Sequence, residues 1–134
     1  LVGTRELIEK AHRWRKMTGG GMRQAGILAE AGIYALENNV QRLIDDHEKA
    51  KVLAKGLSEI EGLNADLINV HTNMVFVDMD VDRKEQLMGF LKERGIKTGG
   101  YDQLRLVTHH DIDAADIALV IEAFREFTST NRQT

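Results

Sequence analysis

Residues 14–26 read Trp-Arg-Lys-Met-Thr-Gly-Gly-Gly-Met-Arg-Gln-Ala-Gly, and this stretch divides the first part of the chain into two helices. Three consecutive glycines end a basic segment, because glycine weakens a helix and allows backbone conformations that are closed to other residues. We expect one helix over about residues 4–17, with Thr4 as its N-cap, and a second over about residues 22–37. Arg23 would then lie in the first turn of the second helix.

The same glycine block has the features of an anion-binding site. Glycine lets backbone amides approach a ligand, and a helix N-terminus adds unpaired N–H groups and a partial positive charge. Lys16 precedes the glycines and Arg23 follows them, so two cations flank the block. A flexible joint between two helices, with both cations simply solvated, explains the same residues. The glycines alone do not decide between the two interpretations.

The composition limits the classes of function. Six of the 18 lysines and arginines, but only two of the 21 acidic residues, lie in residues 1–24, so a basic segment adjoins an acidic remainder. This distribution favours a small anion or an acidic partner over a long nucleic acid, which normally needs a broad basic face. The sequence contains no cysteine, no apolar run of membrane-spanning length and no signal peptide. We therefore expect a cytoplasmic protein that binds neither nucleic acid nor membrane.

From about residue 40 the apolar pattern predicts a third helix followed by a small sheet. The helix covers about residues 40–60, with an apolar stripe of period near 3.6. After Gly62 the period changes, and short β-branched and aromatic runs predict strands. The further elements, in order, are a strand at 67–70, a strand at 74–79, a helix capped by Asp82 with Glu85 and stopped by Gly95, a strand at 96–98, a strand at 104–108, and a last helix opened by Asp113 with Asp116.

This order of elements predicts the fold class α/β, with an α+β-like small domain. A helical connector is followed by a small, mostly antiparallel sheet with helices packed on one face. We place the connector in residues 1–60 and the small domain in residues 61–134. The chain opens with Leu1-Val2-Gly3, which has the pattern of a strand end, so we expect the sequence to be a fragment.

Arg105 is the candidate residue of the small domain. By alternation along its strand, Arg105 lies on the face opposite Leu104 and Leu106. A guanidinium aimed off a sheet can donate two parallel hydrogen bonds to a carboxylate. An antiparallel sheet with one solvated face explains the same pattern, so both interpretations stay open.

The remaining polar clusters suggest no catalytic residue. His109-His110-Asp111 is typical of a capping or loop segment, because adjacent histidines on an extended chain point in opposite directions and share a metal poorly. We therefore expect no metal site. No lysine has an obviously buried, activated setting for Schiff-base chemistry. The sequence thus offers groups that bind anions and none that performs a reaction step.

Three segments together carry a family resemblance. Residues 15–26, residues 72–75 (Thr-Asn-Met-Val) and residues 104–109 (Leu-Arg-Leu-Val-Thr-His) occur in this order. The chain closely resembles, over essentially its whole length, the C-terminal part of the low-specificity L-threonine aldolases. That family belongs to the fold type I, aspartate-aminotransferase-like superfamily of pyridoxal 5'-phosphate (PLP) enzymes. The resemblance implies that residues 1–60 include the end of the large PLP-binding domain and that residues 61–134 are the C-terminal small domain.

The resemblance also implies roles for the candidate residues. Lys16 and Arg23 would bind the phosphate of PLP held by a neighbouring subunit, and Arg105 would bind the substrate carboxylate. The implied activity is that of a carbon–carbon lyase of amino-acid metabolism, which cleaves L-threonine or L-allo-threonine to glycine and acetaldehyde. The implied assembly is a homotetramer, a dimer of dimers.

The resemblance places the Schiff-base lysine upstream of Leu1, in an N-terminal PLP-binding portion that would be the partner of this chain. We therefore expect the isolated chain to be inactive. Two alternatives remain open at this point. The chain could be a stand-alone small-molecule-binding domain without catalytic activity. It could also be an oligomerisation domain without catalytic activity, which the Ala- and Gly-rich helix at residues 22–37 supports.

Overall fold

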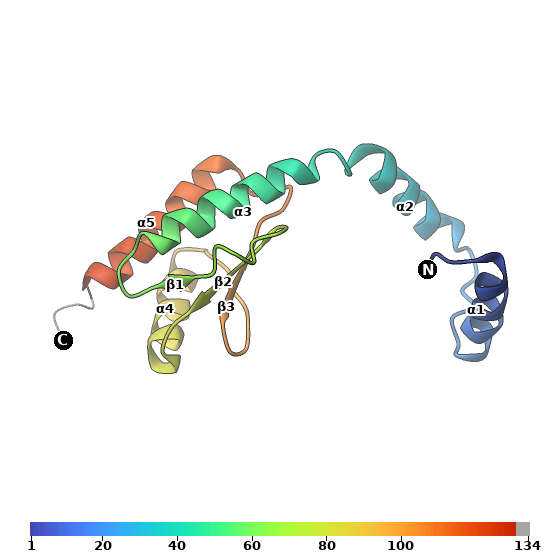
Figure 1. Cartoon of the computed structure of the whole chain (residues 1–134), viewed down its shortest axis with the longest axis horizontal. Helices are drawn as coiled ribbons and strands as arrows, with labels where there is room; N and C mark the ends of the chain where they lie inside the picture. Colours follow the sequence, from blue (N-terminus) through green and yellow to red (C-terminus); the bar gives the residue numbers. More distant parts are fainter. Residues whose placement is uncertain (131–134) are drawn as a thin grey trace. The chain divides into compact units, whose positions relative to one another are not determined.

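The computed structural model describes residues 1–130, and the chain divides into two compact units, Leu1–Val40 and Gln41–Thr134. The first unit holds helices α1 (Arg5–Met17) and α2 (Gly26–Asn38), and the second holds three helices and a small sheet (Figure 1). The division falls earlier than the expected boundary near residue 60. The reason is that helix α3 (Leu43–Ser58) packs on the sheet and on the last helix, so it belongs to the second unit.

The first unit follows the predicted pattern at its start and departs from it at α2. The Thr4 hydroxyl accepts a hydrogen bond from the Leu7 amide at 3.3 Å, which confirms the predicted N-cap of α1. Helix α2 begins at Gly26 rather than near residue 22, because Gln24 adopts a left-handed backbone conformation with φ of +51°. The prediction that Arg23 lies in the first turn of α2 is therefore wrong. Arg23 lies in the turn that precedes the helix.

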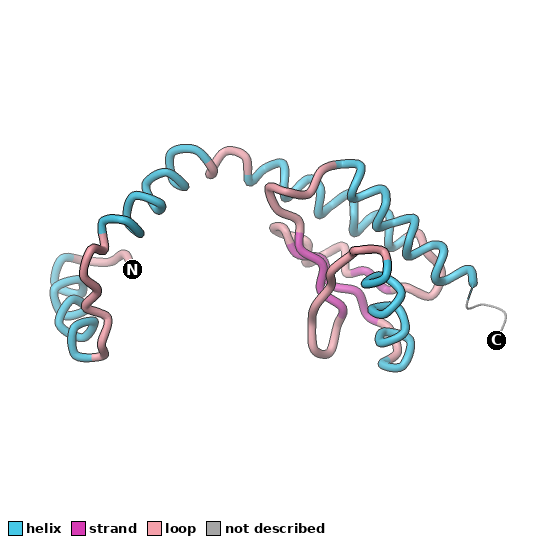
Figure 2. The backbone as a smooth tube through the Cα atoms, turned by 180° about the vertical axis from the view of Figure 1, so that it is seen from behind, coloured by secondary structure: helices cyan, strands magenta, loops and turns pink. Residues whose placement is uncertain are grey.

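The second unit is a three-stranded antiparallel sheet with helices. Its further elements are β1 (Asn64–Ala65), β2 (Met74–Asp78), α4 (Val81–Glu93), β3 (Leu104–Val107) and α5 (Ala114–Thr130). The strand order is β1-β2-β3, and Val75 of β2 pairs with Leu106 of β3. Figure 2 shows the three strands gathered beside the helices of this unit. The predicted fold class is confirmed.

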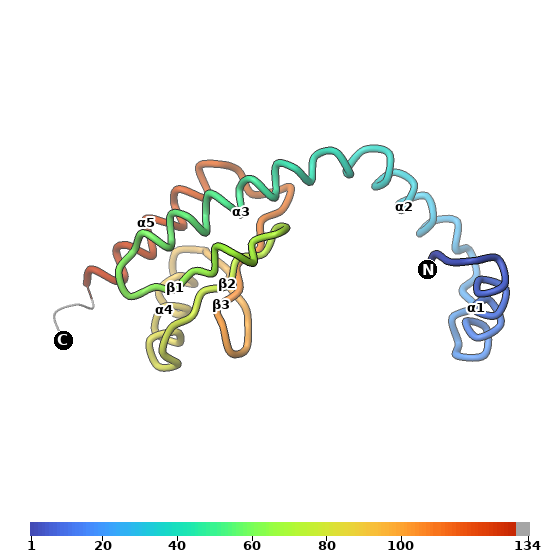
Figure 3. Tube along the Cα trace, viewed as in Figure 1, coloured from blue at the N-terminus to red at the C-terminus, as the bar shows by residue number. Residues whose placement is uncertain are grey.

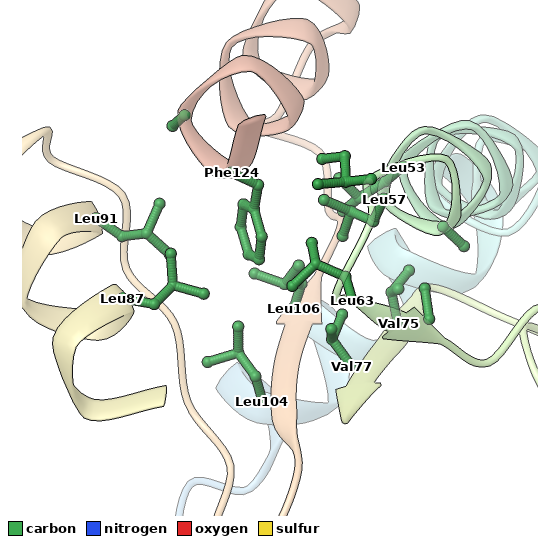
Figure 4. Packing of buried hydrophobic residues seen from close by; sticks show 14 of the residues in the cluster. Leu53, Leu57, Leu63, Val75, Val77, Leu87, Leu91, Leu104, Leu106 and Phe124 are labelled. Atoms are coloured by element: carbon green, nitrogen blue, oxygen red, sulfur yellow. The ribbon is translucent and has the colours of Figure 1, made fainter. Parts of the chain in front are cut away.

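The core lies between one face of the sheet and helices α3, α4 and α5. The inward residues of β2 and β3 alternate with exposed ones, and Figure 4 shows their side chains pointing toward those of the helices. Phe124 of α5 is fully buried at the centre. Each fully buried large aliphatic or aromatic side chain contributes roughly 1.5–3 kcal/mol to the free energy of unfolding. The labelled core residues are Leu53, Leu57, Leu63, Val75, Val77, Leu87, Leu91, Leu104, Leu106 and Phe124.

Two predicted strands are wrong. Residues 67–70 form a turn, because the Asp66 carboxylate accepts hydrogen bonds from the amides of Ile68 at 3.0 Å and Asn69 at 3.2 Å. The carboxylate thus takes the donors that a strand ladder would use. Residues 96–98 form no strand either, and only the next residue, Gly99, pairs with Arg105.

The helix boundaries of this unit depend on local side chains. Helix α4 begins at Val81 with Asp80 as its N-cap, so the expected cap at Asp82 is wrong. At α5 the predicted pair is confirmed, because the Asp113 amide donates to the Asp116 carboxylate at 3.0 Å and the Asp116 amide donates to the Asp113 carboxylate at 2.9 Å. Within residues 1–130, no helix is both long and apolar enough to cross a membrane.

Candidate functional site

The glycine block closes the end of α1. Gly19 has φ of +85°, and its amide donates to the Lys16 carbonyl at 3.3 Å, while the Gly20 amide donates to the Arg15 carbonyl at 2.8 Å. A Cβ atom at Gly20 would lie 2.8 Å from Arg15 Cγ and 3.0 Å from the Arg15 carbonyl oxygen. A residue with a side chain does not fit there without displacing the turn. The tight turn therefore requires glycine.

Lys16 lies directly over this glycine turn. A Cβ atom at Gly21 would be 3.0 Å from Lys16 Nζ, so the ammonium group packs where a side chain would otherwise stand. Within residues 1–130, the Lys16 and Arg23 side chains form no ion pair or hydrogen bond, and the amides of Gly21 and Met22 have no acceptor. An unpaired ammonium group beside free amides on a glycine backbone can bind an oxyanion such as a phosphate group.

Arg105 lies on the outer face of the sheet, opposite the core. Its Cα partner on β2 is Phe76, and the neighbouring pair on this face is Met74 with Val107, each 39% exposed. In the part of the chain that the structure describes, the Arg105 guanidinium has no hydrogen bond and no ion pair. An exposed, unpaired guanidinium among partly apolar side chains can donate two parallel hydrogen bonds to a carboxylate.

A closed loop holds the backbone of Arg105. The Arg105 amide donates to the Gly99 carbonyl at 2.7 Å, and the Gly99 amide donates to the Arg105 carbonyl at 3.2 Å. Gly100 has φ of +108°, and a Cβ atom there would lie 2.0 Å from the Gln103 carbonyl oxygen. Only glycine is accommodated at this point of the loop. Figure 3 shows the segment as the orange hairpin that leads into β3.

Lys84 anchors this loop, and the sequence pattern did not single out this residue. Its side chain is buried, and Nζ donates hydrogen bonds to the carbonyl oxygens of Tyr101 and Asp102, the latter at 3.1 Å. The burial of Lys84 does not contradict the expectation that no lysine has a buried, activated setting for Schiff-base chemistry. Both partners are acceptors, so Lys84 acts as a donor to the backbone and is not an unengaged amine. The signal in the sequence was weak, because the bonded carbonyls lie 17 and 18 residues away.

Two of the three resemblance segments meet in space. Asn73 Nδ2 donates to the Thr108 carbonyl at 2.8 Å, and the Thr108 amide donates to the Asn73 carbonyl at 2.9 Å. The buried Thr108 hydroxyl also donates to the Asp46 carbonyl of α3 at 2.7 Å. These bonds fix the end of β3, three residues beyond Arg105, against β2 and α3.

The histidine cluster has a local role. His109 Nδ1 accepts a hydrogen bond from the Asp111 amide at 3.2 Å, as in a loop-capping arrangement. Among the residues that the structure describes, no three His, Asp or Glu side chains lie close enough to hold a metal ion. The candidate site residues thus fall in the two separate units, Lys16 and Arg23 in the first and Arg105 in the second.

Comparison with known proteins decides the family. The model of the beta-eliminating lyase family matches residues 1–81, which include the glycine block and β2. The chain belongs to the beta-eliminating lyase family. A low specificity L-threonine aldolase of Escherichia coli (strain K12) is 46% identical over 127 residues, which cover 95% of this chain and 37% of that protein. Low-specificity L-threonine aldolase 1 of Arabidopsis thaliana is 38% identical over 138 residues, covering 99% of this chain and 38% of that protein.

A solved structure of a second kind of enzyme shares the fold. The crystal structure of an aminotransferase, TlmJ from Streptoalloteichus hindustanus, matches with a TM-score of 0.56 and 22% identity, over 68% of this chain and 34% of that chain. At this identity the likeness shows the aminotransferase-like fold alone. The resemblance to threonine aldolases is confirmed, and this member of the beta-eliminating lyase family spans a little over a third of the length of the curated relatives it matches. The roles of Lys16, Arg23 and Arg105 stay predictions.

Proposed function

We propose that this chain is the C-terminal portion of a PLP-dependent L-threonine aldolase, which cleaves L-threonine or L-allo-threonine to glycine and acetaldehyde. The similarity to threonine aldolases over 95% or more of the chain supports the family of reactions. The observation that carries the proposal is Arg105, an exposed guanidinium without a partner in the described structure, on a partly apolar sheet face.

In this proposal Arg105 orients the substrate. Two parallel hydrogen bonds to the carboxylate fix the rotation about the bond between the amino nitrogen and Cα. The Cα–Cβ bond is then the one oriented for cleavage. Arg105 transfers no proton. Its contribution is an alignment that a solvated amino acid does not have.

Lys16 and Arg23 would hold the phosphate group of PLP, and the neighbouring subunit would supply that PLP. The free amides of Gly21 and Met22 suit the same oxygens. PLP, when bound, supplies an acceptor for the electrons released as the Cα–Cβ bond breaks. The proposal assigns no catalytic residue to this chain. In this proposal the Schiff-base lysine lies in a part of the aldolase that this chain does not include.

The exposed apolar surface of the first unit supports the proposal that it packs against partner subunits or domains. No residue of α1 or α2 is buried, although α2 carries several large apolar side chains, such as Ile27, Leu28 and Leu36, that are 61–75% exposed. Helices with exposed apolar surface normally pack against more protein. The partners we propose are the N-terminal PLP-binding portion of the aldolase and neighbouring subunits, in a homotetramer.

A reconstitution experiment tests the proposal. The 134-residue chain is mixed with the N-terminal portion of the aldolase and PLP, and acetaldehyde release from L-threonine and the visible absorption of bound PLP are recorded. We expect both signals from the mixture and neither from the chain alone. Acetaldehyde release by the chain alone, with PLP added, would contradict the proposal.

A further inference from the structure

Lys84 is a buried charge with a specific set of partners. The residue is 8% exposed, and its Nζ donates to the carbonyl oxygens of Tyr101 and Asp102. Burying an ammonium group is costly unless hydrogen bonds replace the lost water. The two carbonyls supply that replacement. The same bonds fix the backbone of the loop, because moving a carbonyl away would cost the buried charge one of its two acceptors.

The loop that Lys84 holds is tied to Arg105 at its other side. The backbones of Gly99 and Arg105 exchange two hydrogen bonds, of 2.7 and 3.2 Å. Gln103 Nε2 donates to Asp78 Oδ1 at 2.8 Å, which joins the loop to the end of β2. Lys84 therefore holds the tip of a closed loop, while the ladder and Gln103 hold its base.

We propose that Lys84 is a positioning residue for Arg105. By holding the tip of the loop, it fixes the backbone that pairs with residue 105, and so it sets where the guanidinium stands before a ligand binds. Within residues 1–130 the guanidinium has no side-chain partner of its own, so its backbone determines its starting position. The inference rests on the proposed function, in which Arg105 binds the substrate carboxylate. Lys84 itself touches neither substrate nor cofactor.

The first arm of the test measures the loop in the 134-residue chain by amide hydrogen exchange. Lys84→Met keeps the length and apolar stem of the side chain and removes the donors. We expect the amides of Gly99 and Arg105 to exchange roughly tenfold faster, because a charge-assisted bond to the loop is lost. Lys92→Met is the matched control, since Lys92 is an exposed lysine on the same helix. Its exchange rates should equal those of the unsubstituted chain.

The second arm measures steady-state kinetics of the full-length aldolase loaded with PLP. Lys84→Met should raise KM for L-threonine roughly 10-fold to 100-fold, the effect of a misplaced binding group, with a smaller change in kcat. Arg105→Ala should raise KM at least as much. The double variant should behave as Arg105→Ala alone, because Lys84 acts only through Arg105. Lys92→Met should leave both constants unchanged.

The outcomes separate this inference from the proposed function. If Arg105→Ala raises KM but Lys84→Met changes neither KM nor amide exchange, the inference is wrong and the proposed function stands. If the two substitutions add fully in the double variant, Lys84 acts independently of Arg105 and the inference is again wrong. If Arg105→Ala has no effect on KM, the proposed function fails and the inference with it. Should Lys84→Met not fold, Gly100→Ala disturbs the same loop, and its comparison with Arg105→Ala decides in the same way.

Discussion

Gly56 and Gly89 provide a pair of identical substitutions with opposite expected signs. Both glycines lie inside helices, Gly56 in α3 and Gly89 in α4. Replacing a helical glycine by alanine stabilises a helix by roughly 0.5–1 kcal/mol when the new methyl group has room. At Gly89 a Cβ atom would meet nothing within 4 Å. Gly89→Ala should therefore raise the free energy of unfolding by about 0.5–1 kcal/mol.

At Gly56 the new methyl group would meet α5. Its Cβ atom would lie 2.4 Å from Ile121 Cδ1, 3.0 Å from Cγ1 and 3.3 Å from Cγ2. Rotation about a single side-chain bond does not remove all three contacts, because Cγ1 and Cγ2 branch from the same carbon. Overpacking of this kind costs roughly 1–3 kcal/mol. Set against the helix gain, Gly56→Ala should lower the free energy of unfolding by about 1 kcal/mol.

Urea denaturation of the 134-residue chain, followed by circular dichroism, measures both values. With slopes of roughly 1–3 kcal/mol per molar urea, the two variants should differ in midpoint by about 0.5–2 M. The Gly89→Ala midpoint should lie above that of the unsubstituted chain, and the Gly56→Ala midpoint below it. If Gly56→Ala stabilises the chain as much as Gly89→Ala does, the close packing of α3 against α5 described above is wrong.

Two further predictions concern the candidate phosphate site and the turn at Asp66. Lys16→Ala or Arg23→Ala in the full-length aldolase should each weaken PLP binding by about 1.5–3 kcal/mol, the usual value for a hydrogen bond to a charged group, and fluorescence titration with PLP measures this. Unchanged affinity in both variants would favour the flexible joint. Hydrogen bonds, chiefly from the Asn69 side chain, hold the pKa of Asp66 below its usual value of 3.8. Because the folded-state pKa is lowered, this stabilisation is complete above that value and is lost as the pH falls through the lowered pKa. The stability difference between the unsubstituted chain and Asp66→Ala should thus shrink in acid below pH 3.8, and a difference that grows there would refute this assignment.

Sequence patterns predicted the elements whose signals are local. Asp113 and Asp116 lie three residues apart, and the structure confirms the predicted pair. The alternation along β3 predicted that Leu104 and Leu106 share one face, and the structure buries both. Arg105 was found as an outward-facing residue because alternation alone decides its side of the sheet.

The failures have equally specific causes. The apolar run at 67–70 resembles a strand, but the Asp66 carboxylate takes the backbone amides that follow it. The start of α2 was misplaced because nothing in the composition reveals the left-handed conformation of Gln24. The burial of Lys84 depends on carbonyls of a loop beyond α4, and hydrogen bonds to the backbone of a distant segment leave no periodic trace in the sequence.

The most direct test of the central claim is the value of kcat/KM for L-threonine in the full-length aldolase with and without Arg105. Arg105→Ala should lower kcat/KM by the equivalent of about 2–4 kcal/mol, because a bidentate, charge-assisted contact to the carboxylate is lost. The change should be carried mainly by KM. An unchanged kcat/KM would contradict the account and make Arg105 an ordinary residue on the solvated face of an antiparallel sheet.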